Sequence, residues 1–380
     1  MRSGARVVRA SDVLARLQHR SSRQTPVNAP RPKIGRYSAY TVLGFVGYGV
    51  ASLVGAALAT AWQLTLGERL VALVAPPLAF IAAITIATAL KGREWIVFYH
   101  AAFGALIAVV CAGLAIDACV WRLVDIATLG IGTFLVFGRL GCFSVACCHG
   151  RPARRGVVYR DAHVAVGLGR RWAHRPLVPV QVIEAAGTLV LVATGLLVSQ
   201  TPGRAALVFG GGYAMMRFAL ELVRGDPVRP FAYGLSEAQW CCLAVGALCA
   251  IARPLPWTLA IAGALAAGAI VLIAHRRRRE LLLPAHLHEL DLLCDAVLAD
   301  PAHARRDTRL GVGASYHALP DGRRDWVLSS AHPAWSAAAA HAISEALWPG
   351  AEVVAGRTPG VVHVIVASAN SDAWVSRDRS

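Results

Sequence analysis

Hydrophobic residues occur in long blocks between Tyr37 and Ala274, separated by short polar segments. Each block is about 20 residues long, the length of α-helix that crosses the hydrocarbon core of a bilayer. The pattern predicts seven or eight membrane-spanning helices, because the boundaries near Gly138 and Pro254 are not sharp. The expected spans are 38–62, 69–90, 96–116, 123–143, 179–199, 204–223, 234–252 and 255–274.

A different pattern begins after residue 280, where apolar and polar residues alternate over short stretches. Alternation with a period of two is typical of strands with one buried face. Strands are expected at 310–318, 326–328, 353–354 and 361–366, a helix at 334–347, and a connecting helix at 280–299. This segment predicts a small soluble α+β domain in which no catalytic motif stands out.

The fold class that follows is an all-α polytopic membrane protein with a small C-terminal soluble α+β domain. Residues 1–36 hold nine Arg or Lys and one acid, so we expect a basic disordered arm. The transmembrane domain is expected at 37–274, a basic and helical linker at 275–304, and the α+β domain at 305–370.

Composition supports an integral membrane protein. The 380 residues are 56% hydrophobic and 16% charged, whereas a soluble chain carries roughly a quarter charged residues. The net charge of +16 could indicate nucleic acid, but the arginines flank apolar spans. We therefore expect contact with anionic lipid head groups and no nucleic-acid partner.

Loop charge predicts an orientation. The arm, the 149–178 loop with its seven arginines, and the tail after Arg276 lie on one side if there are eight spans. The positive-inside rule makes that side cytoplasmic.

Several ionisable residues lie within or at the ends of the expected spans. Arg139 follows an apolar run, and Arg217, Glu221 and Arg224 share one side of a later span. Such residues are costly in a bilayer and survive where they face a cavity or one another. A snorkelling Arg139 and an intrahelical Arg217–Glu221 pair explain them without a site. The functional interpretation is a net positive site whose guanidinium groups hold a phosphate.

Three further polar residues complete the candidate site. His100 lies early in the third span, where it is either a packed histidine or a general base. Gln181 and Glu184 share one face of the fifth span, and Glu184 could instead interact with the helix dipole.

Cysteines cluster just after Arg139. Cys142, Cys147, Cys148 and His149 are ligand types for zinc. Their spacing lacks a CxxC pair, so small residues in a tight re-entrant turn are the preferred interpretation. No metal and no cofactor are predicted.

Three ordered motifs carry a family resemblance. They are Gly138-Arg139-Leu140-Gly141-x-Phe143 followed by Gly150-Arg151; Pro179-x-Gln181-x-x-Glu184; and Tyr213-x-x-x-Arg217-Phe218-x-x-Glu221-x-x-Arg224-x-Asp226 followed by Gly234-Leu235-Ser236-x-x-Gln239. Across residues 40–252 the chain resembles the prolipoprotein diacylglyceryl transferase family. The resemblance implies a bacterial inner-membrane enzyme that moves diacylglycerol from phosphatidylglycerol to the thiol of a lipobox cysteine in a prolipoprotein.

The resemblance also implies residue roles. Arg139 and Arg217 would hold the lipid phosphate, His100 would act as base, and Glu221 completes the implied catalytic set. The implied substrate-binding set is Gly141, Cys142, Gly150, Gln181, Glu184 and Arg224. The implied partners are phosphatidylglycerol, prolipoproteins and membrane lipids.

The sequence departs from the family pattern on the acceptor side. Cys142 replaces an asparagine, residues 145–147 replace Asn-Gly-Glu, Ala101 and Ala102 replace two glycines, and Ile183 replaces a tyrosine. The family faces the region matching the 149–178 loop outward, against the charge rule.

Three other functions stay open. One is a non-catalytic membrane protein that binds an anionic lipid or partner in the same cavity. Another is a membrane thiol oxidoreductase using Cys142, Cys147 and Cys148. The third is a transporter, although there is no inverted repeat to support it.

Overall fold

A computed structural model describes residues 33–366 apart from 35, 93–97, 166–167, 170–171, 227–230, 278–279, 301 and 303. The expected basic arm lies outside the described residues except for 33, 34 and 36. Contacts divide the chain into two compact units, one containing the helices up to Val271 and the other the segment from Leu272 onward. Each unit is described by itself.

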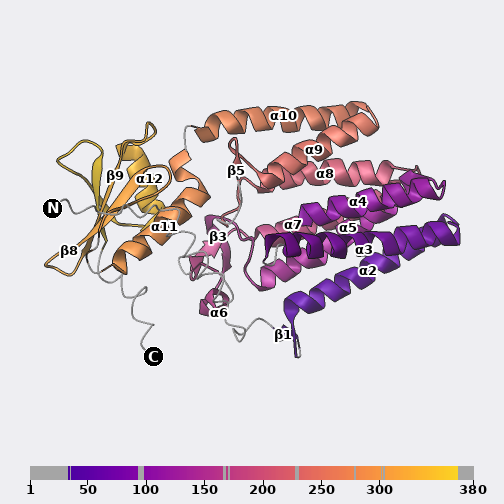
Figure 1. Cartoon of the computed structure of the whole chain (residues 1–380), viewed down its shortest axis with the longest axis horizontal. Helices are drawn as coiled ribbons and strands as arrows, with labels where there is room; N and C mark the ends of the chain where they lie inside the picture. The colour runs from indigo at the N-terminus through magenta and orange to yellow at the C-terminus, as the bar shows by residue number, and fades with distance from the viewer. Residues whose placement is uncertain are drawn as a thin grey trace. The chain divides into compact units, whose positions relative to one another are not determined.

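The first unit contains eight long helices in the described residues, each within a few residues of a predicted span (Figure 1). They are α2 (Ala39–Ala61), α3 (Leu66–Lys91), α4 (Phe98–Ala115), α5 (Val120–Ser144), α7 (Val180–Val198), α8 (Arg204–Leu220), α9 (Glu237–Ala252) and α10 (Pro256–Arg277). Six of these described helices are long and apolar enough to cross a membrane, and α8 and α9 are shorter. The protein is therefore a polytopic membrane protein.

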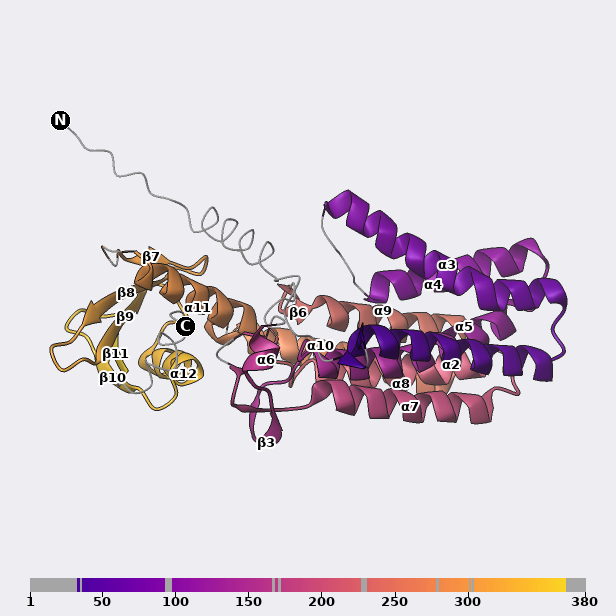
Figure 2. The ribbon, with the colours of Figure 1, turned by 90° about the horizontal axis from the view of Figure 1, so that it is seen from below.

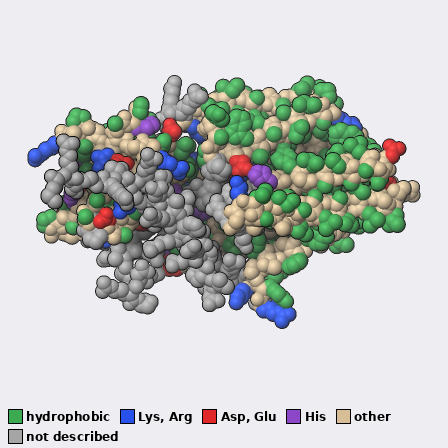
Figure 3. Space-filling model, in the orientation of Figure 1, with side chains coloured by type: hydrophobic (Ala, Val, Ile, Leu, Met, Phe, Trp, Pro, Cys, Tyr) green, Lys and Arg blue, Asp and Glu red, His purple; other side chains and the backbone are tan. Residues whose placement is uncertain are grey.

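Large apolar side chains face outward from these helices. Phe45 is 74% exposed, Leu90 81%, Leu197 83% and Ile251 78%. Figure 3 shows apolar side chains spread across the visible surface of the helices, with few charged ones among them. A surface of this kind is stable against lipid tails and costly in water.

Helix α5 is the central element of the first unit. It contacts α2, α3, α4, α7 and α8 (Figure 2). More than half of the residues in its most apolar 18-residue stretch are buried. Its buried face carries apolar residues such as Leu123 and Leu129 together with the polar residues Asp125 and Arg139. Polar groups on the most buried helix must find partners on neighbouring helices.

Asp125 finds its partners at the start of α8. Its side chain accepts hydrogen bonds from Gly203 N at 2.6 Å and Ala206 N at 2.7 Å. The first backbone N–H groups of a helix have no acceptor within the helix. Asp125 supplies two acceptors, because Gly203 at the N-cap of α8 has no side chain for this purpose.

Short hairpins precede or connect helices of the first unit. Strand β3 (Pro152–Val158) pairs with β4 (Pro176–Leu177), and helix α6 (Asp161–Val164) lies between them in sequence. Two smaller hairpins are β1 (Lys33–Ile34) with β2 (Tyr37–Ser38), and β5 (Phe231–Ala232) with β6 (Leu235–Ser236). The sequence pattern predicted none of these strands.

The second unit is built on a five-stranded antiparallel sheet of order β10-β11-β9-β8-β7. Its elements are η2 (Glu280–Leu282), α11 (Pro284–Leu298), β7 (Arg306–Asp307), β8 (Val312–Ala318), β9 (Arg324–Ser330), α12 (Ala337–Leu347), β10 (Glu352–Ala355) and β11 (Val361–Val366). The expected helices and strands are all present, and β7 is an additional strand. Trp326 lies opposite Val364 and Tyr316 in a core shared with both helices.

Candidate active site

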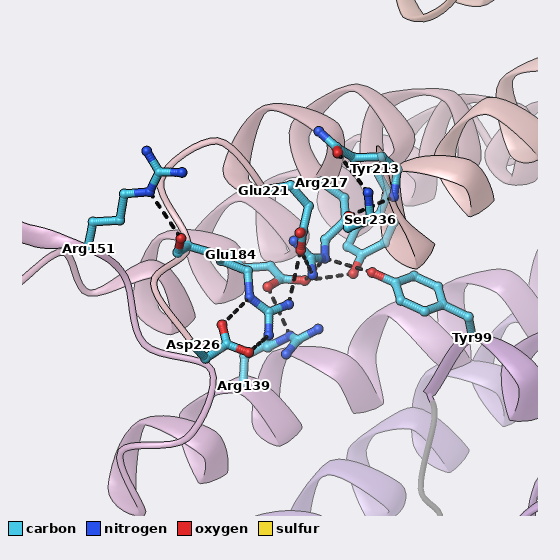
Figure 4. Close-up of polar contacts among 11 residues, drawn as sticks. Tyr99, Arg139, Arg151, Glu184, Tyr213, Arg217, Glu221, Asp226 and Ser236 are labelled. Atoms are coloured by element: carbon cyan, nitrogen blue, oxygen red, sulfur yellow. Dashed lines mark hydrogen bonds and ion pairs between the residues drawn. The ribbon is translucent and has the colours of Figure 1, made fainter. Parts of the chain in front are cut away.

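An ion-paired cluster connects three helices inside the first unit (Figure 4). Arg139 of α5 places Nε 3.0 Å from Oε2 of Glu184, which belongs to α7. Oε1 of the same carboxylate lies 3.5 Å from Nε of Arg217 on α8. Glu184 and Arg217 are each 1% exposed. Buried charges persist where they are paired in this way.

The cluster continues from Arg217 along the chain. Glu221 Oε1 is paired with Arg217 Nη2 and lies 3.2 Å from Arg224 Nη1. Arg224 also donates to both carboxylate oxygens of Asp226, at 2.8 and 2.9 Å. The five sequence-predicted residues Arg139, Glu184, Arg217, Glu221 and Arg224 therefore lie together.

The charge of this cluster differs from the expected net positive site. Three arginines, Arg139, Arg217 and Arg224, face three carboxylates, those of Glu184, Glu221 and Asp226. Because these charges balance, an anion would be bound by free N–H donors of the arginines and not by a net positive charge. Arg151 adds one positive charge at the rim, where its Nε donates to Arg224 O at 3.3 Å.

One such donor is present. Nη1 of Arg217 is buried and has no hydrogen-bond partner among the described residues. Nε of Arg139 lies at ion-pair distance from Glu184 without hydrogen-bond geometry. An unpaired buried donor costs roughly 1–3 kcal/mol, so its presence favours a ligand that accepts from it.

Two tyrosines hold the cluster in place, and sequence reasoning had not placed either in the site. Tyr99 OH accepts from Arg217 Nε at 2.7 Å. Tyr213 OH donates to Glu184 Oε1 at 2.7 Å. Tyr213 lies one turn before Arg217 on the same face of α8. This spacing could have identified Tyr213 as a site residue from the sequence. Tyr99 stood in an apolar stretch that gave no such signal.

The loop after α5 is anchored to the end of α8. Gly150 forms a β-bridge with Arg224, and Gly150 N donates to Val178 O at 3.0 Å. A Cβ at Gly150 would lie 2.5 Å from Val178 O and 2.6 Å from Val178 Cβ. Only glycine allows the two backbones to approach so closely. This contact positions the loop beside the ion-paired cluster.

Gln181 ties the same loop to α7. Its Nε2 donates to Cys147 O at 2.6 Å and to Tyr159 OH at 3.4 Å. Gln181 is fully buried, and burial raises the pKa of Tyr159 to about 12. The phenol therefore stays protonated at neutral pH.

Three thiols meet in this loop. The Sγ atoms of Cys142, Cys147 and Cys148 all lie within 4.8 Å of one another. Hydrogen bonds with Cys142 and Cys147, together with the charges of Arg224 and Arg139, lower the pKa of Cys148. Gly141 precedes the group, and a Cβ there would lie 3.0 Å from the ring of Tyr40.

His100 lies apart from the cluster in the described contacts. Its Nε2 is 2.9 Å from Glu237 Oε1 on α9, and its side chain is 55% exposed. Adjacent helical residues point about 100° apart, so Tyr99 reaches Arg217 while His100 faces α9. Ser236, which is drawn with the cluster in Figure 4, caps the start of α9, where its Oγ accepts from Gln239 N at 3.3 Å.

The arginine–carboxylate cluster and its loop occupy the region that matches a family model. The model of the prolipoprotein diacylglyceryl transferase family matches residues 41–253, more than half of the chain. The chain belongs to the prolipoprotein diacylglyceryl transferase family. A similar protein is the phosphatidylglycerol--prolipoprotein diacylglyceryl transferase of Dehalococcoides mccartyi, 32% identical over 122 residues. That match covers 31% of this chain and 44% of the relative, so the chain spans less than half of its length.

Proposed function

We propose that this protein is a transferase that moves diacylglycerol from phosphatidylglycerol to the thiol of a prolipoprotein cysteine. Membership of the prolipoprotein diacylglyceryl transferase family supports the reaction class. The observation that carries the proposal is the buried Arg139–Glu184–Arg217 cluster with the free donor Nη1 of Arg217.

The phosphate of the lipid fits this cluster by its chemistry. Guanidinium groups bind phosphate oxygens through two parallel N–H donors. Arg217 keeps Nη1 for such an oxygen, while Tyr99, Glu184 and Glu221 engage its other nitrogens. Ion pairs already hold Arg139, Glu184 and Arg217 together before the lipid binds. The arginines therefore need little rearrangement to bind it.

Fixed arginines also favour the chemical step. When the bond between the glycerol carbon and the phosphate oxygen breaks, negative charge grows on the departing glycerol phosphate. Donors that are already in place stabilise this charge more in the transition state than in the ground state. Arg139 and Arg217 take this role, and Arg224 and Glu221 hold Arg217 in position.

The acceptor must lose a proton. A cysteine thiol has a pKa of about 8.5, so only a few per cent is thiolate at neutral pH. His100 remains the proposed base, with Glu237 at 2.9 Å orienting its imidazole. Gly141, Cys142, Gly150 and Gln181 form the proposed acceptor side, since they belong to or contact the loop beside the cluster.

The finer architecture belongs to the same proposal. All eight described helices would cross the bilayer, α8 and α9 as short spans supported by their neighbours. The segment 305–366 would be a soluble α+β domain. The expected location is the bacterial cytoplasmic membrane, with membrane lipids as surroundings and no nucleic-acid partner.

Transfer to a peptide tests the function. Purified protein would be incubated with phosphatidylglycerol and a lipobox peptide, and the diacylglyceryl thioether detected by mass spectrometry. We expect product with the unaltered protein and none with Arg217→Ala or Arg139→Ala. Arg204→Ala is the matched control, because Arg204 lies on the same helix as Arg217 and is exposed.

Two results would contradict the proposal. Full activity in both arginine variants would remove the cluster from the reaction. Phosphatidylglycerol bound by the unaltered protein without any product, across peptides of different sequence, would favour a non-catalytic lipid-binding protein.

A further inference from the structure

The cysteine group beside the cluster has a geometry that its sequence spacing did not suggest. Cys142 lies in the last turn of α5, and Cys147 and Cys148 lie in the turn that follows the helix. All three sulfurs lie within 4.8 Å of one another. Zinc–sulfur bonds are about 2.3 Å, which places two sulfurs on one tetrahedral ion about 3.8 Å apart. Movements of about 1 Å by side chains would suffice.

The backbone of the turn is held in an uncommon conformation. Ala146 has φ of 56° and Cys148 has φ of 57°. Left-handed backbone is unfavourable for residues other than glycine by roughly 1–2 kcal/mol each, and it tends to accumulate at functional sites. The hydrogen bonds from Cys147 N to Cys142 O at 3.2 Å and from Gln181 Nε2 to Cys147 O at 2.6 Å hold this turn. The result is that three thiols point to one place.

We propose that Cys142, Cys147 and Cys148 bind one Zn²⁺ whose fourth position receives the acceptor thiol. A zinc site with three protein ligands and one open position is typical of catalysis, whereas a structural site is closed by four. No fourth cysteine, histidine or carboxylate joins the three sulfurs among the described residues. Cys147 is exposed, so a sulfur atom from another molecule can reach an ion bound there.

The ion would promote loss of the proton from the acceptor thiol, which the proposed reaction requires. This inference rests on that proposed reaction. A thiol bound to Zn²⁺ is deprotonated, and its proton passes to solvent or to a base. The sulfur electron pair then forms the S–C bond to the glycerol carbon. The C–O bond to phosphate breaks, and its electron pair leaves on glycerol phosphate. No electron donor or acceptor is required.

The surroundings suit the charge of such a site. Three thiolates and one Zn²⁺ carry a net charge of −1. Arg139 lies three residues before Cys142 on α5, and Arg224 forms a β-bridge with Gly150, two residues after Cys148. Arg139 is one of the two arginines proposed to hold the phosphate, and Arg224 pairs with Glu221, which holds the other, Arg217. The acceptor sulfur and the lipid phosphate would therefore be brought together at Arg139.

Metal binding by the full chain in detergent tests the site. The protein would be purified without chelators, loaded with Zn²⁺ and passed through gel filtration before its metal content is measured. We expect about one Zn²⁺ per chain. Cys148→Ser should lower the affinity by more than the roughly 10–100-fold that loss of a second-shell partner costs. Cys111→Ser, an exposed cysteine on α4, is the matched control and should retain the metal.

Cobalt gives a second measurement on the unaltered protein. Co²⁺ in place of Zn²⁺ should show thiolate-to-metal absorption bands. Addition of a lipobox peptide should change this spectrum, and the same peptide with serine in place of its cysteine should not. An unchanged spectrum with the cysteine peptide would overturn the acceptor role.

Other outcomes separate this inference from the proposed function. Transfer by a metal-free Cys142→Ser, Cys147→Ser, Cys148→Ser protein would overturn the site and leave the transferase. A disulfide between two of the three cysteines, seen as two thiols that take up alkylating agent only after reduction, would also overturn it. Bound metal and a peptide-dependent spectrum without product would support the site and refute the transferase.

Discussion

Arg139 Nε lies 3.0 Å from Glu184 Oε2, which joins α5 to α7 by an ion pair inside the helical unit. Glu184 is also 3.5 Å from Arg217. One carboxylate therefore balances two arginines that come from different helices. Removing either partner of a buried pair leaves an uncompensated charge, and this costs more than the pair itself contributes.

Glu184→Gln should therefore destabilise the protein and abolish transfer. We expect a loss of about 3–5 kcal/mol in the free energy of unfolding, as for other broken buried pairs. Urea-induced unfolding in detergent would measure it. Glu237→Gln is the comparison, because Glu237 pairs with His100 at a half-exposed position. Equal stability of the two variants would contradict the role assigned to Glu184.

Tyr99→Phe should slow transfer without removing lipid binding. The substitution deletes the oxygen that accepts from Arg217 Nε at 2.7 Å, and an unpaired buried donor costs roughly 1–3 kcal/mol. We expect kcat/KM to fall about tenfold, since about 1.4 kcal/mol corresponds to a factor of ten. Tyr48→Phe, at an exposed position of α2, should leave kcat/KM unchanged. A similar fall in both variants would argue against a specific role for Tyr99.

Gly150→Ala should disrupt the loop beside the cluster. The added Cβ would lie 2.5 Å from Val178 O, and Gly150 cannot move away without disturbing its bridge to Arg224. Gly138→Ala gives the control, because nothing lies within 4 Å of a Cβ at Gly138. Transfer assays and proteolysis of the 145–178 loop should separate the two variants. Normal loop protection in Gly150→Ala would contradict the close approach.

His286 should make the C-terminal unit sensitive to acid. His286 Nδ1 lies 2.7 Å from Leu281 O, and Nε2 lies 3.1 Å from Thr308 Oγ1. Burial lowers the pKa of His286 below its usual 6.5. The unfolded chain then binds the proton more tightly than the folded one, so stability is complete above pH 6.5 and declines as the pH falls below it.

Proteolysis in urea would measure this effect in the full chain. The urea concentration at which residues 280–366 become cleavable should fall between pH 7.5 and pH 5.5. His286→Gln should reduce this difference, because glutamine does not titrate in this range. An equal decline in the variant would assign the acid sensitivity to other groups.

The sequence anticipated the helices far better than the connections between them. Apolar blocks of bilayer length are a local property, so the eight long helices of the first unit begin and end close to their expected residues. The β3–β4 hairpin depends on Gly150 meeting Val178 and Arg224. That meeting is a tertiary contact which no local pattern records.

The candidate site shows the same division. Arg139, Glu184 and Arg217 could be selected because charge within an apolar span is rare. Their neutral balance could not be predicted, since it depends on Asp226 turning back onto Arg224. Tyr99 escaped notice because a tyrosine in an apolar span ordinarily packs against lipid or neighbouring helices.

The cap that Asp125 places on α8 has a consequence at the far end of both helices. Asp125 contacts Gly203, and the same number of residues separates Asp125 from Arg139 as separates Gly203 from Arg217. Both intervals correspond to about 21 Å of helix. Arg139 and Arg217 therefore lie equally far along their helices from the contact between Asp125 and Gly203. A single inserted residue in either one would turn its arginine by about 100°, so the lengths of these segments should be under strict constraint even where their side chains are free to vary.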